Sequence, residues 1–210
     1  MRVIAGCSRN TRLECPPGNE VRPMLEKVRG AVFNIFNQVT PGATVLDLFA
    51  GCGSLGVEAL SRGAAWCVFV ERNPEARRFL EANLARAKLA ASCDVIQGDV
   101  YRCVSRLKRL GRKFRLLLVD PPYDVWADAQ GRARVLETLD SLSDEGLLAG
   151  RPWFVIHHDP RSPAPESTRT LAFDEQRRYG RSAVSIYALK GAAPAEEGPA
   201  ETCAPENTES

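Results

Sequence analysis

The chain alternates between two patterns of apolar and polar residues, one typical of buried strands and one of amphipathic helices. Short and nearly continuous apolar runs predict strands at 44–49, 66–70, 93–96, 114–119 and 153–156. Between these runs, apolar residues recur every three or four positions, which predicts helices at 55–61, 74–87, 100–110 and 133–142. Strands that alternate with helices predict parallel strands with helices on both faces, which is a doubly wound α/β sheet.

The two ends of the chain follow other patterns. Residues 2–5 predict an extended segment, 8–12 a turn, and 26–36 a helix with a stripe of apolar residues. Residues 170–173 and 183–189 predict a closing antiparallel hairpin. We therefore expect an N-terminal arm and helix at 1–40, one α/β domain at 41–190, and a tail at 191–210. The tail is rich in Ala, Pro and Glu, a composition that predicts disorder.

Charge is distributed unevenly between the tail and the rest of the chain. The tail holds five glutamates and no Lys or Arg, which leaves 28 basic and 21 acidic residues, a net charge of +7, in residues 1–190. Residues 1–40 carry six basic side chains against three glutamates. This favours a polyanion as partner, with the arm holding a nucleic-acid backbone. The alternative, a solvated hairpin that caps the sheet, stays open.

Other classes of protein are disfavoured by the composition. No apolar run approaches the roughly 18 residues of a membrane span, and the apolar stretch at the N-terminus is far shorter than the roughly 7–15 residues of a signal-peptide core. We therefore expect a cytoplasmic protein with no membrane partner. The cysteines form no Cys-x-x-Cys pair, so we expect reduced packing residues and no metal site. They lie at positions 7, 15, 52, 67, 93, 103 and 203.

A glycine-rich loop follows the first predicted strand. Gly51, Gly53 and Gly56 form the pattern G-x-G-x-x-G, which dinucleotide and methyl-donor sites share. Asp47, on the preceding strand, distinguishes these ligands, because its carboxylate would repel a pyrophosphate and attract an ammonium or a sulfonium. At about 4 Å and an effective dielectric near 20, such a pair is worth roughly 4 kcal/mol before desolvation. The pattern therefore favours S-adenosylmethionine over NAD.

Two more acids stand at the ends of the next two strands. Glu71 closes the second strand, where a carboxylate can bind both hydroxyls of a ribose. Asp99 follows the third strand, where it can accept a hydrogen bond from an adenine amino group. Either acid alone could instead cap a helix or face solvent. Because the carboxyl ends of parallel strands share one edge, the three acids together predict a site for an adenosyl ligand.

The fourth strand runs directly into Asp120-Pro121-Pro122-Tyr123. The prolines fix the backbone and remove two N–H donors, so that carbonyls such as that of Pro121 point outward. An exocyclic amine on a heterocycle is a poor nucleophile, and Asp120 with a fixed carbonyl can each accept one of its N–H groups. Asp120 can also take the proton that is lost after transfer. Tyr123 offers a face for a base taken out of its stack. The alternative is that the segment is only a rigid turn.

Four stretches resemble the RsmD family of 16S rRNA guanine-N2 methyltransferases, over about residues 1–190. They are 2–6 with the Pro-Pro-Gly at 16–18, the segments 22–23, 28–29 and 33–34, the loop and helix at 47–64, and 120–123 with 179–180. The resemblance implies a Rossmann-like class I S-adenosylmethionine-dependent methyltransferase fold. The implied partner is 16S rRNA or an assembling small ribosomal subunit, and we expect a monomer.

The resemblance also implies roles for individual residues. The donor, S-adenosylmethionine, would be bound by Asp47, Phe49, Gly51, Gly53, Gly56, Glu71 and Asp99. The target guanine would meet the catalytic residues Asp120, Pro121 and Tyr123. The RNA backbone would be held by Arg22 and Arg29, with Arg29 on the polar face of its helix. The sequence departs from the family pattern at Met24, where a Thr is usual, and at His157 and His158, where we would expect an acid. We expect both histidines on the surface.

Three other functions remain open at this point. The first is methylation of a DNA adenine or a protein glutamine, although such families more often carry Asn where Asp120 stands. The second is a catalytically inactive RNA-binding assembly factor, which the intact Asp47 and Asp120 disfavour. The third is an NAD oxidoreductase, which Asp47 and the lack of a hydride-transfer constellation disfavour.

Overall fold

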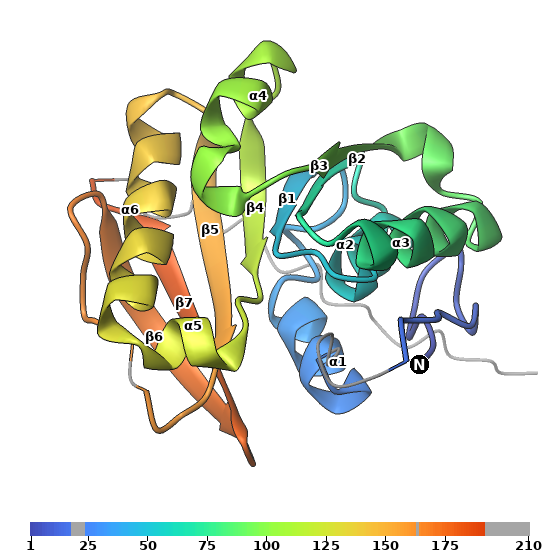
Figure 1. The fold of residues 1–210 in the computed structure, drawn as a ribbon, viewed down its shortest axis with the longest axis horizontal. Coiled ribbons are helices and arrows are strands. Elements are labelled where there is room, and N and C mark those ends of the chain that lie inside the picture. The colour runs from blue at the N-terminus through green and yellow to red at the C-terminus, as the bar shows by residue number, and fades with distance from the viewer. Residues whose placement is uncertain (18–23, 163, 192–210) are drawn as a thin grey trace, which may run out of the picture.

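The computed structural model describes residues 1–17, 24–162 and 164–191. Within these residues, seven strands form one sheet in the order β3-β2-β1-β4-β5-β7-β6 (Figure 1). Neighbouring strands from β3 to β5 are parallel, whereas β7 runs antiparallel to β5 and β6. The strands are β1 (Thr44–Leu48), β2 (Trp66–Glu71), β3 (Cys93–Gln97), β4 (Phe114–Val119), β5 (Leu148–His158), β6 (Leu171–Tyr179) and β7 (Ser182–Leu189).

Helices cover both faces of this sheet. Helices α1, α2 and α3 pack on one face, and α4, α5 and α6 pack on the other (Figure 1). They are α1 (Glu26–Ile35), α2 (Ser54–Ser61), α3 (Pro74–Arg86), α4 (Val104–Arg109), α5 (Tyr123–Ala127) and α6 (Ala129–Asp144), with short 3-10 turns η1 (Ala90–Ser92) and η2 (Val100–Arg102). This arrangement confirms the predicted doubly wound sheet with its closing antiparallel hairpin.

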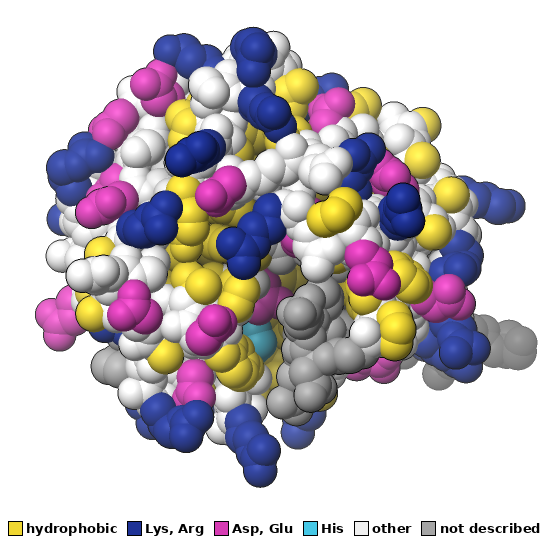
Figure 2. Space-filling model, in the orientation of Figure 1, with side chains coloured by type: hydrophobic (Ala, Val, Ile, Leu, Met, Phe, Trp, Pro, Cys, Tyr) yellow, Lys and Arg dark blue, Asp and Glu magenta, His cyan; other side chains and the backbone are white. Residues whose placement is uncertain are grey.

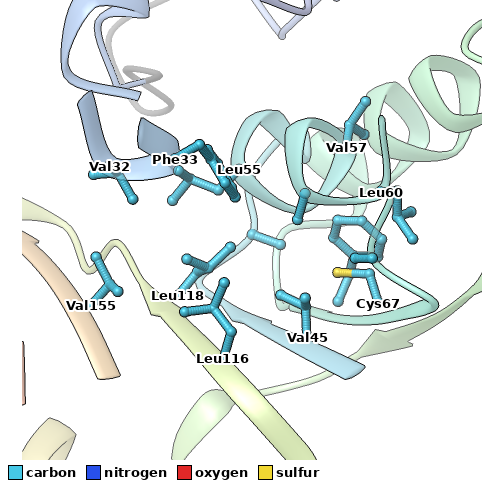
Figure 3. Close-up of a cluster of buried hydrophobic side chains, with 14 of the residues drawn as sticks. Val32, Phe33, Val45, Leu55, Val57, Leu60, Cys67, Leu116, Leu118 and Val155 are labelled. Atoms are coloured by element: carbon cyan, nitrogen blue, oxygen red, sulfur yellow. The ribbon is translucent and has the colours of Figure 1, made fainter. Parts of the chain in front are cut away.

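Side chains along the central strands alternate between the two helical layers. Leu116 and Leu118 of β4 face α1 and α2, where Phe33 and Leu55 lie (Figure 3). Leu117, between them, belongs to the separate cluster beneath α4 and α6. A strand covered on both faces must be apolar at nearly every position, which explains the continuous apolar runs. Each such side chain contributes about 1.5–3 kcal/mol through burial.

Several elements differ from their prediction. Helix α6 begins at Ala129 rather than at 133, and the helix predicted at 100–110 is divided into η2 and α4. Strand β5 begins at Leu148 rather than at 153, because Leu148 pairs with Phe114 before a shift in register. Strand β6 continues to Tyr179 rather than ending at 173. It is the edge strand, half exposed to solvent, so it needs no apolar run. Helix α5 begins directly after Pro122, in a segment predicted only as a loop.

The N-terminal segment folds back over α1 and α2. Arg2 and Arg12 form an antiparallel bridge, which confirms the predicted extended segment and turn. Val3 and Leu13 are buried in the same core as α1. Met24 is buried there as well, so the side chain at this position packs against apolar neighbours. These contacts support the alternative in which the segment caps the sheet.

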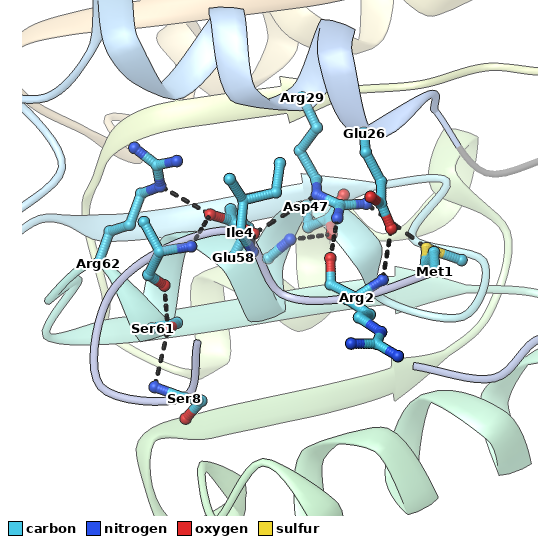
Figure 4. Close-up of polar contacts among 12 residues, drawn as sticks. Met1, Arg2, Ile4, Ser8, Glu26, Arg29, Asp47, Glu58, Ser61 and Arg62 are labelled. Carbon is cyan, nitrogen blue, oxygen red and sulfur yellow. Dashed lines mark hydrogen bonds and ion pairs between the residues drawn. The ribbon is translucent and has the colours of Figure 1, made fainter. Parts of the chain in front are cut away.

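The prediction that Arg29 projects from the polar face of α1 is wrong. Its side chain is fully buried, with Nε 3.5 Å from Oε2 of Glu58, which is buried too (Figure 4). The guanidinium also donates to the carbonyl of Arg2. A cation enclosed in this way has no path to an RNA phosphate, which removes Arg29 from the expected RNA contacts. Arg22, the other expected contact, lies outside the described residues.

Cys15 and Cys52 form a disulfide, which contradicts the expectation that the cysteines are reduced. Asn83 holds the same two segments together, because its side-chain nitrogen donates to the carbonyls of Glu14 and Cys52 at 2.8 and 2.9 Å. Cys15 and Cys52 are 37 residues apart in the sequence, so their disulfide results from a tertiary contact that no local spacing predicts. The free cysteines of the described residues are Cys7, Cys67, Cys93 and Cys103.

None of the helices in the described part of the chain has the length and apolar character needed to cross a membrane. Within the same residues, no three side chains of His, Cys, Asp or Glu gather in a way that could hold a metal ion.

Candidate active site

Asp47 is a buried carboxylate with one unsatisfied oxygen. Its side chain lies near the end of β1 and is only 1% exposed. Oδ2 accepts a hydrogen bond from the amide of Gly56 at 2.8 Å, whereas Oδ1 is buried without a partner among the described residues. Burial raises the pKa of Asp47 to about 8, against the lowering effect of that amide, and the nearby Asp120 and Glu71 raise it further. A buried acceptor without a donor fits a cationic ligand group.

The loop after β1 owes its shape to backbone angles that L-residues rarely adopt. Phe49, Gly51 and Gly53 have positive φ values of 60°, 55° and 84°. Phe49 is not a glycine, so its left-handed backbone is strained, and such strain is common at ligand sites. Glu71, at the end of β2, holds this loop, because its Oε2 accepts from the amide of Gly51 at 2.7 Å.

Gly56 is required for a different reason, the close approach of α2 to the sheet. A Cβ at this position would lie 2.2 Å from Cε1 of Phe69 on β2. The absent side chain therefore lets the first turn of α2 approach β1, where the amide of Gly56 meets Asp47. The three loop glycines thus have two roles, turn geometry and helix–sheet packing.

Asp99 stands after β3 and borders a hollow in the surface. Its Oδ1 caps η2 by accepting from the amide of Tyr101 at 3.0 Å. The hollow has a volume of about 290 Å³ and is lined by Ile96, Gly98, Asp99, Arg102, Cys103 and Arg106. The ring of Tyr101 meets Phe49 edge to face, with centroids 6.1 Å apart. Asp99 therefore combines a capping role with access to a hollow at the end of β3.

Asp120 lies at the end of β4 and contacts a histidine. Its Oδ1 is 2.7 Å from Nδ1 of His157, and its side chain keeps 21% of its surface exposed. The hydroxyl of Tyr123 lies 3.4 Å from Nε2 of the same ring and 3.3 Å from Oγ of Ser182. Four side chains from four elements or their ends therefore form one hydrogen-bonded chain that begins at Asp120.

The prediction that both histidines lie on the surface is wrong. His157 is 4% exposed and His158 is fully buried, because β5 lies between β4 and β7 and continues to His158. His158 points away from Asp120, stacks on Trp126 and bonds the hydroxyl of Ser185. Burial lowers the pKa of His158. Figure 2 shows a histidine and an acidic side chain together in a recess of the surface.

The Asp-Pro-Pro-Tyr segment is both the end of β4 and the start of α5. The carbonyl of Pro122 accepts from the amide of Trp126 at 3.0 Å and so belongs to the helix. Of the two proline carbonyls predicted to point outward, that of Pro121 is the better candidate for a ligand. Tyr123 is 38% exposed, so part of its side chain is accessible to a partner.

The two groups of residues meet where the strand order reverses. From β1 the chain builds outward through β2 and β3, and from β4 it builds outward in the other direction through β5. Leu48 and Val119 are paired across β1 and β4, which puts Asp47 and Asp120 at neighbouring strand ends. Ligands of doubly wound sheets bind at this reversal. The structure therefore brings together the predicted residues of the donor and the target sites.

His157 is the site residue whose contact the sequence did not reveal. In the parallel pairing of β4 and β5, Val119 is opposite Ile156, so the next residues on each strand are Asp120 and His157. Aligning the ends of the fourth and fifth predicted strands would have found the pair. The two predicted strands end at the paired residues 119 and 156, so the signal was present in the sequence although no local pattern confirmed it.

Comparison with known proteins identifies the family of this chain. The family model described as Conserved hypothetical protein 95 matches residues 1–188. YlbH from Bacillus subtilis (strain 168) is 33% identical, over 91% of this chain and 100% of that protein. Ribosomal RNA small subunit methyltransferase D from Escherichia coli (strain K12) is 30% identical, over 89% of each chain.

Solved structures show the same likeness along most of the chain. The Escherichia coli protein yhhF has a TM-score of 0.74 at 29% identity, over 90% of this chain and 97% of that one. A protein from Thermus thermophilus has a TM-score of 0.72 at 28% identity, over 89% of this chain and 98% of that one. Fold and sequence therefore agree: the chain belongs to the Conserved hypothetical protein 95 family, the RsmD family of rRNA methyltransferases.

Proposed function

We propose that this protein uses S-adenosylmethionine to methylate the exocyclic N2 amine of a guanine in 16S ribosomal RNA. The observation that carries the proposal is the meeting of two carboxylates at the strand-order reversal. One, Asp47, is buried with an unsatisfied oxygen, and the other, Asp120, is accessible beside Pro121 and Tyr123. The relatives named ribosomal RNA small subunit methyltransferase D support the choice of substrate.

The donor side is formed by the ends of β1, β2 and β3. S-adenosylmethionine, when bound, supplies a methyl group carried on a positively charged sulfur. Asp47 would accept from the ammonium of this ligand, which satisfies its buried oxygen. Glu71 would bind the ribose hydroxyls through the lone pairs left by its two backbone hydrogen bonds. Asp99 would accept from the adenine amine, and Phe49 and the glycines would shape the cavity wall.

The target side is formed by Asp120, Pro121 and Tyr123. Asp120 and the carbonyl of Pro121 would each accept one N–H of the guanine amine. This holds the nitrogen in place and favours attack by its lone pair. After transfer, the nitrogen must lose a proton, and Asp120 is the acceptor within reach. Tyr123 would stack on the guanine once the base has left its own stack, an interaction worth about 1–3 kcal/mol.

RNA on either side of the target base would contact the surface between α1 and β6. A hollow of about 450 Å³ there is lined by Ala31, Asn34, Ile35, Arg177 and Tyr179. Arg178, the residue between the two lining residues of β6, is exposed, as is Arg181 in the turn that follows. The turn at 180–181 leads into Ser182, which contacts Tyr123, so this surface continues to the target side. Basic and acidic side chains are mixed on the face shown in Figure 2, which favours a local contact over a broad basic surface.

Mapping the methylated nucleotide tests the proposed function. The purified protein is incubated with labelled S-adenosylmethionine and either naked 16S rRNA or small-subunit particles from cells that lack the protein. Nuclease digestion and mass spectrometry then identify the product, which we expect to be N2-methylguanosine. Asp120→Ala serves as the control for contaminating activity. Label on adenine, on protein or on no RNA would contradict the proposal.

A further inference from the structure

Three side chains continue a hydrogen-bonded chain from Asp120. His157 lies 2.7 Å from Oδ1 of Asp120, Tyr123 lies 3.4 Å from the other ring nitrogen, and Ser182 lies 3.3 Å from the tyrosine hydroxyl. His157 and Ser182 are 4% and 5% exposed. The interior of the chain is therefore shielded from water, and only Asp120 and Tyr123 reach the surface.

For an ionised Asp120 and a neutral ring of His157, the chemistry of the partners assigns the direction of these hydrogen bonds. An ionised carboxylate can only accept, so Nδ1 of His157 must carry the hydrogen that faces Asp120. In the neutral ring, Nε2 is then an acceptor, and it faces the hydroxyl of Tyr123. That hydroxyl donates to Nε2 and can accept from Ser182. Every donor in this arrangement meets an acceptor.

We propose that His157 is a positioning residue, which holds Oδ1 of Asp120 so that Oδ2 faces the target amine. This inference rests on the proposed function, in which Asp120 accepts an N–H of that amine. A carboxylate rotates freely about two bonds when nothing holds it, and the exposed part of Asp120 has room to do so. His157 occupies one oxygen and leaves the other for the substrate. Its own ring need not touch the RNA.

Substitutions that put a side-chain amide at the position of only one of the two ring nitrogens test this role. His157→Asn can place an amide N–H near the position of Nδ1, whereas His157→Gln reaches the position of Nε2, and His157→Ala replaces neither. We expect the Asn variant to retain kcat within about fivefold, and the Gln and Ala variants to lose roughly 10–100-fold, the scale of a misplaced catalytic group. Donor affinity and the KM for RNA should change by less than about twofold, because His157 is buried and its proposed role involves no contact with either ligand.

His158→Asn is the matched control, since it removes the adjacent buried histidine of the same strand, whose ring contacts Ser185 rather than Asp120. Thermal unfolding of each variant separates loss of folding from loss of turnover. An Asn variant no better than the Ala variant, at equal folded fraction, would overturn the proposal. So would an Ala variant that turns over at the wild-type rate.

A measurement without RNA gives an independent answer. Two-bond proton–nitrogen correlation spectra identify which nitrogen of a histidine carries hydrogen, and the chain has only two histidines. We expect the neutral ring of His157 to carry hydrogen on Nδ1, and the Nε2–H form would refute the proposal. If the wild-type protein proves to methylate another substrate, the guanine assignment fails, while the same variants on that substrate still decide the role of His157.

Discussion

Folding places the side chain of Asp47 in an environment that disfavours its charged form. Its pKa is about 8 in the folded protein and 3.8 in the absence of the fold, because burial disfavours its charge. The folded protein therefore binds this proton more tightly than the unfolded chain does. The contribution of Asp47 to stability is fully present below pH 3.8 and is lost as the pH rises towards 8. A bound cation would stabilise the charged form of Asp47 and so offset the effect of burial.

We predict that ligand binding at pH 7 releases about one proton from Asp47, since an adjacent ammonium lowers the pKa of a carboxyl. The demethylated donor product keeps that ammonium and is a stable probe. Calorimetry in two buffers with different ionisation enthalpies measures the release. Asp47→Asn should bind more weakly and release no proton. Equal heats for the wild-type protein in both buffers would count against the role of Asp47.

Asp120 should affect turnover without affecting donor binding. Asp120→Ala removes the acceptor for the amine, so we predict a loss in kcat of at least about 100-fold, the usual scale for a positioned proton acceptor. Single-turnover kinetics and donor titration measure the two quantities separately. Tyr123→Phe should be mild and Tyr123→Ala severe, because stacking needs only the ring. A near wild-type rate for Asp120→Ala would make the Asp-Pro-Pro-Tyr segment a simple turn.

At the scale of the element, Arg29 joins α1 to α2. Glu58 on α2 accepts from the backbone of Ile4 and from the half-buried Arg62, and Arg29 adds a second, fully buried cation (Figure 4). We predict that Arg29→Ala lowers the free energy of unfolding by about 3–5 kcal/mol, the usual cost of removing one partner from a buried pair. Urea unfolding measures this change.

Lys27→Ala is the control for Arg29→Ala, because Lys27 lies on the same helix and is exposed. It should change stability by less than about 0.5 kcal/mol. At an equal folded fraction, Arg29→Ala should leave the salt dependence of RNA binding unchanged. A salt dependence that is flatter by about one slope unit would restore Arg29 as a phosphate contact.

Two glycines in helices should respond to alanine with opposite signs. A Cβ at Gly30 in α1 would lie 3.6 Å from Cδ1 of Ile4, which is ordinary contact, so Gly30→Ala should stabilise by about 0.5–1 kcal/mol. A Cβ at Gly56 would overlap the ring of Phe69, so Gly56→Ala should destabilise by about 1–3 kcal/mol and weaken donor binding. Thermal unfolding compares them. If both variants changed the stability in the same direction, the result would contradict this packing.

The elements that the sequence predicted well are those with strong local patterns. The central strands are buried on both faces, so their sequences are continuous apolar runs. Leu117 of β4, which pairs with Leu46 of β1, is an example. Arg29 was misplaced because a helical pattern tells which residues share a face, not whether a buried Glu58 faces them. His157 was misplaced because its partner depends on the register between β4 and β5. Both errors concern polar side chains placed by tertiary contacts.

At the scale of the whole molecule, the sheet separates the two proposed tasks. The strand ends on one side of the reversal, β1 to β3, carry Asp47, Glu71 and Asp99, and those on the other side carry Asp120 and His157. Only the junction of β1 and β4 contributes to both the donor site and the target site. Substitutions on one side should therefore leave the other site largely intact, as their separation implies.

The reversal of strand order also has a consequence for the kinetics of two-substrate turnover. Because the residues proposed for the two ligands stand on different sides of the reversal, we predict that the two substrates bind in random order. The demethylated product should then inhibit competitively against S-adenosylmethionine and non-competitively against RNA. Initial-rate measurements over a grid of both concentrations distinguish this from an obligatory sequence with RNA first, in which inhibition against RNA would become uncompetitive. An encounter with RNA would thus be productive whether or not the methyl donor had arrived first.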